Sequence, residues 1–267
     1  MALTEDTFIS HLVELRDRLM RALIAIAVAF ALIGFWPTYG VIYDFLALPL
    51  IKTLPAGSKM IATGVITPFL IPLKVGLMAA FLLVLPYVLY QAWAFVAPGL
   101  YSHEKKLVLP LVVSSTILFI VGVAFCYYFV FGQLFAFIAG FAPASITPAP
   151  DIEQYLSFVL TMFLAFGVAF EVPVAIIVLV RMGVVNIQQL RDFRGYFVVC
   201  ASIAAAVVTP PDVVSMLALL IPMCLLYEAG IIAASFIVKA KAPDSAVIDP
   251  VAQDFAAVEK EQNSPKV

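Results

Sequence analysis

The chain has 267 residues, of which 64% are hydrophobic and only 12% are charged, and its mean hydropathy is +1.10. A soluble domain carries about 45–50% apolar and about 25% charged residues, so this composition indicates an integral membrane protein and excludes a disordered or collagen-like chain. The net charge of −2 gives no reason to expect nucleic acid as a partner. Cys126, Cys200 and Cys224 lie in apolar runs without metal-ligand spacing, so we expect buried thiols, no metal site and no cofactor.

Six segments are candidates for membrane-spanning helices, each of which needs about 20 apolar residues. The acidic residues before the first segment and the lack of a small-residue cleavage site argue against a cleaved signal peptide. Prolines 143, 148 and 150 end the third span, which must be long or tilted. Consecutive prolines 210 and 211 shorten the fifth span, and Pro222 and Glu228 make the sixth effectively short as well. The predicted spans are residues 19–36, 69–94, 107–138, 155–182, 196–208 and 213–236.

The basic residues set the orientation of these spans. With the N-terminus in the cytoplasm, all of the 15 lysines and arginines except Lys52, Lys59 and Lys74 are cytoplasmic, as the positive-inside rule requires. We therefore predict an all-α integral membrane protein with six transmembrane helices, the last two short, and both termini in the cytoplasm. Three regions follow, namely a cytoplasmic amphipathic N-terminal helix (1–18), a membrane domain (19–238) and a polar, disordered cytoplasmic tail (239–267).

Two connecting segments also carry predictions. Residues 41–51 are apolar but too few to cross a bilayer, so we expect them to lie on its outer surface. Asn186 and Gln189 have the spacing of a capping box, which predicts a short helix on the cytoplasmic side.

Acidic side chains at the cytoplasmic surface form the first candidate site. Glu14 and Asp17 have arginines four residues later, at positions 18 and 21, and such pairs are typical of a solvated interfacial helix. Glu104 follows the interfacial aromatic stretch 90–101, and the simplest interpretation is that it balances the basic residues that anchor this loop at the cytoplasmic surface. The functional alternative is that both carboxylates accept guanidinium groups of a ligand, because a carboxylate can bind a guanidinium in bidentate geometry.

Glu171 is the second candidate, because it is the single acid within the fourth span and lies near the bilayer centre. A charge at that depth costs about 2.5–3.5 kcal/mol on insertion scales, so this group must be protonated, paired or hydrated. Pro173 favours a local kink. A protonated acid hydrogen-bonded within the bundle is the purely structural alternative.

The third candidate is the sequence Thr209-Pro210-Pro211-Asp212 between the fifth and sixth spans. Asp212 is well placed to cap the following helix. Two sequence signatures of enzymes are missing, since the chain has no P-loop and no H-E-x-x-H sequence, and we predict that it is not an enzyme.

These residues together resemble the TatC family, the multispanning core of the twin-arginine protein translocase. The resemblance rests on HLVELRDRL (11–19), YQAWAFVAPGLY (90–101) with His103 and Glu104, YLSF (155–158), FGVAFEVPV (166–174) and TPPD (209–212). Each piece is common, but their order on six spans is specific. Lys105 and Lys106 stand where several family members have a basic residue such as Arg.

The resemblance implies a receptor in the bacterial cytoplasmic (inner) membrane that binds paired-arginine signal peptides of folded proteins and nucleates assembly for export driven by the proton-motive force. By position, the signal-peptide-binding residues are Glu14, Arg16, Phe95 and Glu104, and Glu171 is the polar residue of a concave bundle face. Residues 209–212 and the last two helices border docking sites for the single-span partners TatA and TatB, with self-association in a larger complex.

Two other functions compete with the receptor. One is a proton-coupled secondary transporter that uses Glu171, although such proteins tend to contain inverted repeats with interrupted helices and this chain shows none. The other is a scaffold subunit without a ligand of its own, in which Glu14 and Glu104 are dispensable.

Overall fold

The protein was analysed as a computed structural model, which describes residues 2–34, 39–53, 60–96, 108–141, 149–209 and 212–241. These ranges contain α-helices, one π-helical segment and an isolated bridge between Ile61 and Asp151, and no strand is present in them. The elements are α1 (Ala2–Gly34), α2 (Tyr39–Ile51), α3 (Thr67–Leu83), α4 (Leu85–Val96), α6 (Val108–Phe125), η2 (Cys126–Val130), α7 (Phe131–Phe141), α8 (Ile152–Phe170), α9 (Val172–Arg181), α10 (Ile187–Asp192), α11 (Arg194–Val208) and α12 (Val213–Lys241).

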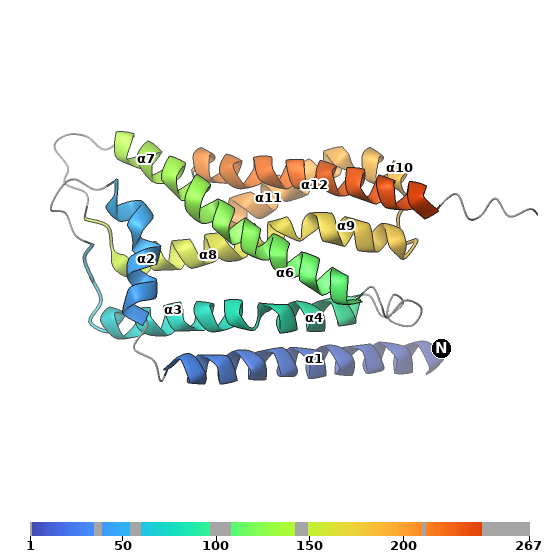
Figure 1. The fold of residues 1–267 in the computed structure, drawn as a ribbon, viewed down its shortest axis with the longest axis horizontal. Coiled ribbons are helices and arrows are strands. Elements are labelled where there is room, and N and C mark those ends of the chain that lie inside the picture. The colour runs from blue at the N-terminus through green and yellow to red at the C-terminus, as the bar shows by residue number, and fades with distance from the viewer. Residues whose placement is uncertain are drawn as a thin grey trace, which may run out of the picture.

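The helices form a bundle in which most members run along one common direction (Figure 1). α1, the α3–α4 pair, the α8–α9 pair, α11 and α12 lie along the long axis, and α6 and α7 cross them diagonally. α2 runs across this direction at one end of the bundle, as expected for a segment on the membrane surface. The start of α1 and the end of α12 lie at the opposite end, so both ends of the described chain share one side of the bundle.

Three helical stretches of the described chain are long and apolar enough to span a membrane, and the bent α3–α4 pair makes a fourth candidate. α1 has the required length, but its last 18 residues include Asp17, Arg18 and Arg21. α11 has only 15 residues. The fold therefore provides several membrane-spanning helices, together with two elements whose charge or length is borderline.

The third predicted span is one continuous helical stretch, Val108–Gly140, of 33 residues. At about 1.5 Å per residue such a helix is longer than the hydrocarbon core of about 30 Å, so it must tilt. Figure 1 shows this tilt in the diagonal course of α6 and α7. The helix begins as predicted and extends to Phe141, three residues beyond the predicted end at Ile138.

Prolines interrupt two of the predicted spans. The hydropathy of the second span predicts one continuous helix. The structure instead has two helices, α3 and α4, which meet at Val84 with a bend of 63°. Pro86 explains the bend, since its ring has no N–H to donate and displaces the carbonyl group four residues earlier. The fourth span, Ile152–Arg181, remains one helical stretch of 30 residues with a one-residue interruption at Glu171, two residues before Pro173, where a local distortion was expected.

The last two helices differ in length. α11 is short, as the double proline predicts. The expectation that the sixth span is also short was wrong, because α12 has 29 residues and continues through Pro222. The missing hydrogen bond of a single proline is tolerated in a membrane helix, where it does not by itself end the helix.

α2 is held against the bundle by two tyrosine hydroxyl groups. Tyr127 donates a hydrogen bond of 2.6 Å to the carbonyl oxygen of Phe45, and Tyr155 donates one of 2.7 Å to that of Leu46. Pro49 lies four residues after Phe45 inside α2 and has no N–H for this carbonyl. The tyrosine therefore replaces a bond that the α2 backbone cannot make.

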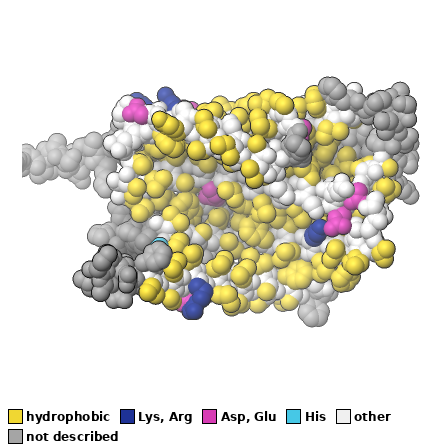
Figure 2. Space-filling view, turned by 180° about the vertical axis from the view of Figure 1, so that it is seen from behind, with side chains coloured by type: hydrophobic (Ala, Val, Ile, Leu, Met, Phe, Trp, Pro, Cys, Tyr) yellow, Lys and Arg dark blue, Asp and Glu magenta, His cyan; other side chains and the backbone are white. Residues whose placement is uncertain are grey.

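The main hydrophobic core joins α2, α3, α8 and the π-helical segment, and Phe131, Phe166 and Met162 are among its fully buried members. The outer surface is also apolar, because hydrophobic side chains cover most of the face in Figure 2, where charged side chains lie mainly toward the ends and one acidic side chain is visible near the middle. This distribution is typical of a bundle that faces lipid. The prediction of three buried thiols was right for Cys126, but Cys200 is exposed and Cys224 is half-buried.

Candidate functional site

Glu14 lies where α1 packs against α4. Its Oε1 atom accepts two hydrogen bonds from Arg18, of 2.8 Å from Nε and 2.6 Å from Nη2, which confirms the predicted i,i+4 pair. Arg18 also reaches Oε1 of Gln91 on α4, at 3.5 Å from Nη1. Among the described residues, the His11 imidazole is the one charged partner near Oε2 of Glu14, at 4.0 Å, and the Glu14 side chain is 40% exposed. The side chain is thus partly exposed, and Oε2 accepts no hydrogen bond from the described residues.

Phe95 contributes to the same surface from the end of α4. Its ring stacks on the imidazole of His11, with centroids 4.4 Å apart and planes 18° apart. His11 is one turn before Glu14, so the stack brings Phe95 to the neighbourhood of the carboxylate. Glu104 lies outside the described residues, in the segment 97–107 that follows α4 directly.

Arg16 points away from the Glu14 side of α1. Its guanidinium group binds Asp17 through two hydrogen bonds, of 3.0 Å from Nε and 2.8 Å from Nη2, and the Arg16 side chain is 71% exposed. The predicted pair between Asp17 and Arg21 was therefore wrong, because the adjacent arginine takes this carboxylate. The structure brings Glu14 and Phe95 together but not Arg16 with either of them.

Glu171 is half-buried and lies at the one-residue break between α8 and α9. Both carboxyl oxygens are inaccessible to solvent, and neither has a hydrogen-bond partner among the described residues. Ser115 lies within interaction range, and its hydroxyl oxygen accepts a bond of 2.8 Å from the indole N–H of Trp93. An ionised carboxylate without a partner is expensive in such surroundings, so the group must be neutral or hydrated.

The turn between α11 and α12 contains the predicted helix cap at Asp212. The Asp212 side chain accepts a bond of 2.6 Å from the backbone N–H of Ser215, which confirms its role as a cap of α12. Thr209 is buried, and its hydroxyl group donates to the carbonyl oxygen of Ala205 at 2.8 Å. Pro210 and Pro211 lie outside the described residues.

Two polar features lie in the region of α10, α11 and α12, one at the start of α10 and one between the start of α11 and the second half of α12. Asn186 and Gln189 form the predicted capping box at the start of α10. Arg194 binds Glu228 through two atoms, each at 2.6 Å, so Glu228 belongs to an ion pair between α11 and α12. This pair was not predicted, because its members are 34 residues apart in the sequence.

A polar cluster at the starts of α3 and α8 was also not predicted from the sequence. Asp151 caps α8 and accepts bonds from the backbone N–H and hydroxyl group of Thr63, at 3.0 and 2.6 Å. These hydrogen bonds hold the pKa of Asp151 at about 2, below its usual range. Glu153 binds Lys74 at 2.9 Å and Thr67 at 2.8 Å. The signal was visible in Lys74, the one charge in the second predicted span, which needs a partner.

No group of three or more potential metal ligands occurs within the part of the chain that the structure describes. The arrangement offers charge-assisted hydrogen bonding at the α1–α4 surface and a half-buried acid with inaccessible oxygens within the bundle, which are features of binding and transport.

A family model described as "Sec-independent protein translocase protein (TatC)" matches residues 10–222, which include the α1–α4 surface, Glu171 and the turn after α11. The chain belongs to the TatC family. Relatives named Sec-independent protein translocase protein TatC are similar to this chain along most of their length. The Escherichia coli (strain K12) relative is 48% identical over 236 residues, which are 88% of this chain and 91% of that protein.

Two further TatC comparisons extend this result. The Halothiobacillus neapolitanus relative is 46% identical over 256 residues, covering 96% of this chain and 69% of its own length. A crystal structure of a twin-arginine translocase receptor TatC superposes with a TM-score of 0.75 at 35% identity, covering 84% of this chain and 99% of that one. The resemblance noted from the sequence motifs is thus confirmed.

Family membership establishes a coarse function. TatC proteins are components of a protein translocase, so this chain is a transport subunit of the membrane rather than an enzyme, and it works in a complex with other translocase components. Its apolar helices are those of a multi-pass membrane protein.

Proposed function

We propose that this chain is the receptor subunit of a twin-arginine translocase and binds the paired arginines of signal peptides at its cytoplasmic face. The observation that carries the proposal is the position of Glu14, half-exposed beside α4, with one carboxylate oxygen that accepts no hydrogen bond from the described residues. Glu104 is eight residues after the end of α4, so we expect both acids to lie at the same membrane surface, within reach of one short peptide.

Arg18 supports this function by showing what the carboxylate of Glu14 binds. Its guanidinium group donates two charge-assisted hydrogen bonds to Oε1, of 2.6 and 2.8 Å, and an arginine of a signal peptide would make the same kind of interaction. A peptide arginine then takes Oε2 or displaces Arg18. Phe95 and His11 supply an apolar, stacked surface at the edge of this acid, and Arg16 contributes only if its bond to Asp17 opens.

The topology proposed with this function has six spans, with both termini in the cytoplasm and the protein in the bacterial inner membrane. Three regions make up the chain, residues 1–18, 19–238 and 239–267. The shared position of the two ends in Figure 1 supports this arrangement. Labelling of single cysteines placed at Ser102 and Ser145 tests it, because only the first is accessible from the cytoplasm.

The partners proposed are TatA and TatB, with docking at Thr209, Pro210, Pro211, Asp212 and the neighbouring helices, and the energy source is the proton-motive force. The exposed side chains of α11, which include Tyr196, Ile203 and Val207, support an apolar contact there. Glu171 is assigned to the concave side of the bundle as its polar residue. Family membership favours this role over a secondary transporter.

The decisive experiment measures binding of a paired-arginine peptide to the purified full chain, with a lysine–lysine peptide as reference. Glu14→Gln and Glu104→Gln each lower the affinity about tenfold or more, because each removes a charge-assisted hydrogen bond. Asp17→Asn is the matched control, since Asp17 is an acid of the same helix held by Arg16.

Arg18→Gln separates a role in binding from a role in folding. It removes the internal competitor of Glu14 and should leave binding unchanged or stronger, whereas a purely structural Glu14–Arg18 pair predicts equal damage from either substitution. Unchanged peptide affinity in both glutamate variants would refute the receptor function and leave the scaffold interpretation.

A further inference from the structure

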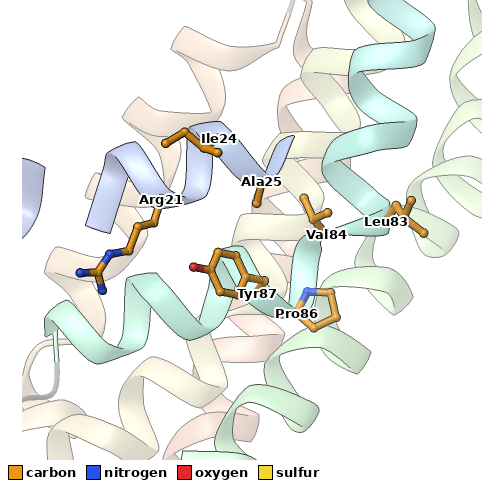
Figure 3. A pocket seen from close by; sticks show the side chains of 7 residues that line it. All are labelled: Arg21, Ile24, Ala25, Leu83, Val84, Pro86 and Tyr87. Atoms are coloured by element: carbon orange, nitrogen blue, oxygen red, sulfur yellow. The ribbon is translucent and has the colours of Figure 1, made fainter. Parts of the chain in front are cut away.

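A groove lies between α1 and the bend that joins α3 to α4, and no part of the proposed signal-binding surface uses it. Its volume is about 520 Å³, within the range of small-ligand sites. Ile24 and Ala25 of α1 and Val84 and Pro86 at the bend form its apolar part. Arg21 and Tyr87 are its polar members, and Figure 3 shows the Arg21 guanidinium and the Tyr87 hydroxyl group extending toward the same end of the groove.

Arg21 brings an uncompensated positive charge to this groove. The two acids of α1 that lie nearest to Arg21 in the sequence are already bound, Glu14 by Arg18 and Asp17 by Arg16. Among the described residues, no carboxylate lies within 4.0 Å of the Arg21 guanidinium group. A ligand that enters the groove therefore meets a positive charge, and an anionic group complements it.

The position of Arg21 along α1 places this charge at a membrane boundary. Arg21 is the last charged residue of α1, and residues 22–34 carry none. Ile24 and Ala25 follow within about 6 Å along the helix axis, on the apolar side of that boundary. The groove thus changes from polar to apolar over one helical turn, and Ile24, which is 56% exposed, leaves it open to the surrounding lipid.

We propose that this groove is a binding site for one anionic phospholipid. The phosphate group lies against the Arg21 guanidinium and accepts a hydrogen bond from the Tyr87 hydroxyl group, and an acyl chain packs against Val84 and Pro86 at the bend. Arginine suits this role because its planar donors match two phosphate oxygens. Basic pockets between membrane helices are typical sites for acidic head groups.

The charge also distinguishes this occupant from a peptide. A signal peptide with paired arginines would place like charges beside Arg21, which disfavours its apolar stretch in this groove. The bend supplies the space, because a straight helix through residue 84 would keep α3 and α4 in line along α1, whereas the observed helices diverge by 63°.

The test uses the delipidated full chain in detergent, titrated with phosphatidylglycerol or with phosphatidylcholine of the same acyl chains and measured by native mass spectrometry. One phosphatidylglycerol per chain should bind, more tightly than phosphatidylcholine. Arg21→Gln should weaken phosphatidylglycerol binding about tenfold and Tyr87→Phe about threefold, in line with a charge-assisted and a neutral hydrogen bond. Arg191→Gln, an equal charge change on exposed α10, is the matched control and should have no effect.

Ala25→Phe provides an independent check, because it fills the apolar part of the groove and leaves Arg21 in place. Loss of phosphatidylglycerol in this variant supports the proposal, and full retention places the lipid elsewhere. Equal weakening by Arg21→Gln and Arg191→Gln would reduce the effect to general surface charge and overturn the site. Displacement of the lipid by a paired-arginine peptide that crosslinks to position 87 would assign the groove to the peptide instead.

Discussion

At Gly122, α6 approaches α8 so closely that no side chain fits between the two helices. An alanine Cβ there would lie 2.6 Å from the backbone oxygen of Phe166 and 2.9 Å from the ring of Phe170. The ring can rotate, but the backbone oxygen belongs to a buried helix and cannot move alone. Gly122→Ala therefore forces the two helices apart and loses packing along their shared contact.

Gly132 of α7 allows the cost of this separation to be isolated. A Cβ at Gly132 meets nothing within 4 Å. Both substitutions share the gain of about 0.5–1 kcal/mol from replacing a helical glycine by alanine. Overpacking costs about 1–3 kcal/mol, and it applies to Gly122→Ala alone. The difference between the two variants therefore measures the overpacking.

The assay is thermal unfolding in detergent, followed by far-ultraviolet circular dichroism. A destabilisation of 1 kcal/mol lowers Tm by about 2–4 °C in a chain of roughly this size, so Gly122→Ala should melt at least about 3 °C below Gly132→Ala. Equal Tm values for the two variants would refute the close approach of α6 and α8 at this residue.

Three further predictions concern contacts found only in the structure. Tyr127→Phe leaves the Phe45 carbonyl unpaired opposite Pro49 and should cost about 1–3 kcal/mol, whereas the exposed neighbour change Tyr128→Phe should cost nothing measurable in the same melts. Glu228→Gln should lower Tm by about 1–3 °C because the pair with Arg194 is half-exposed, and 1 M salt should abolish the difference. The pKa of Asp151 is lowered from 3.8 to about 2, so its ionised form stabilises the fold above about pH 4, and this contribution is lost as the pH falls toward 2. Asp151→Asn should remove that part of the acid dependence of Tm, and an unchanged acid limb would contradict the bonds to Thr63.

Much of this protein was predictable from the sequence because membrane helices are determined locally. Apolar length marks a span and charge marks its cytoplasmic end, so the positions of α1, α8 and α12 follow from hydropathy and basic residues alone. The break beside Pro173 and the Asp212 cap follow from the backbone chemistry of single residues. The family resemblance also needed only the linear order of short motifs.

Partners between helices were decided by the tertiary structure. Asp17 pairs with Arg16 and not with Arg21. The Lys74–Glu153 pair depends on how α3 and α8 are rotated about their axes, which no local sequence pattern specifies. The 63° bend was missed because a hydropathy profile remains continuous through a proline that turns the chain. The sequence by itself therefore determines which segments enter the membrane, while the packing of those segments decides which polar groups meet, because such contacts depend on the relative rotation and tilt of helices far apart in the chain.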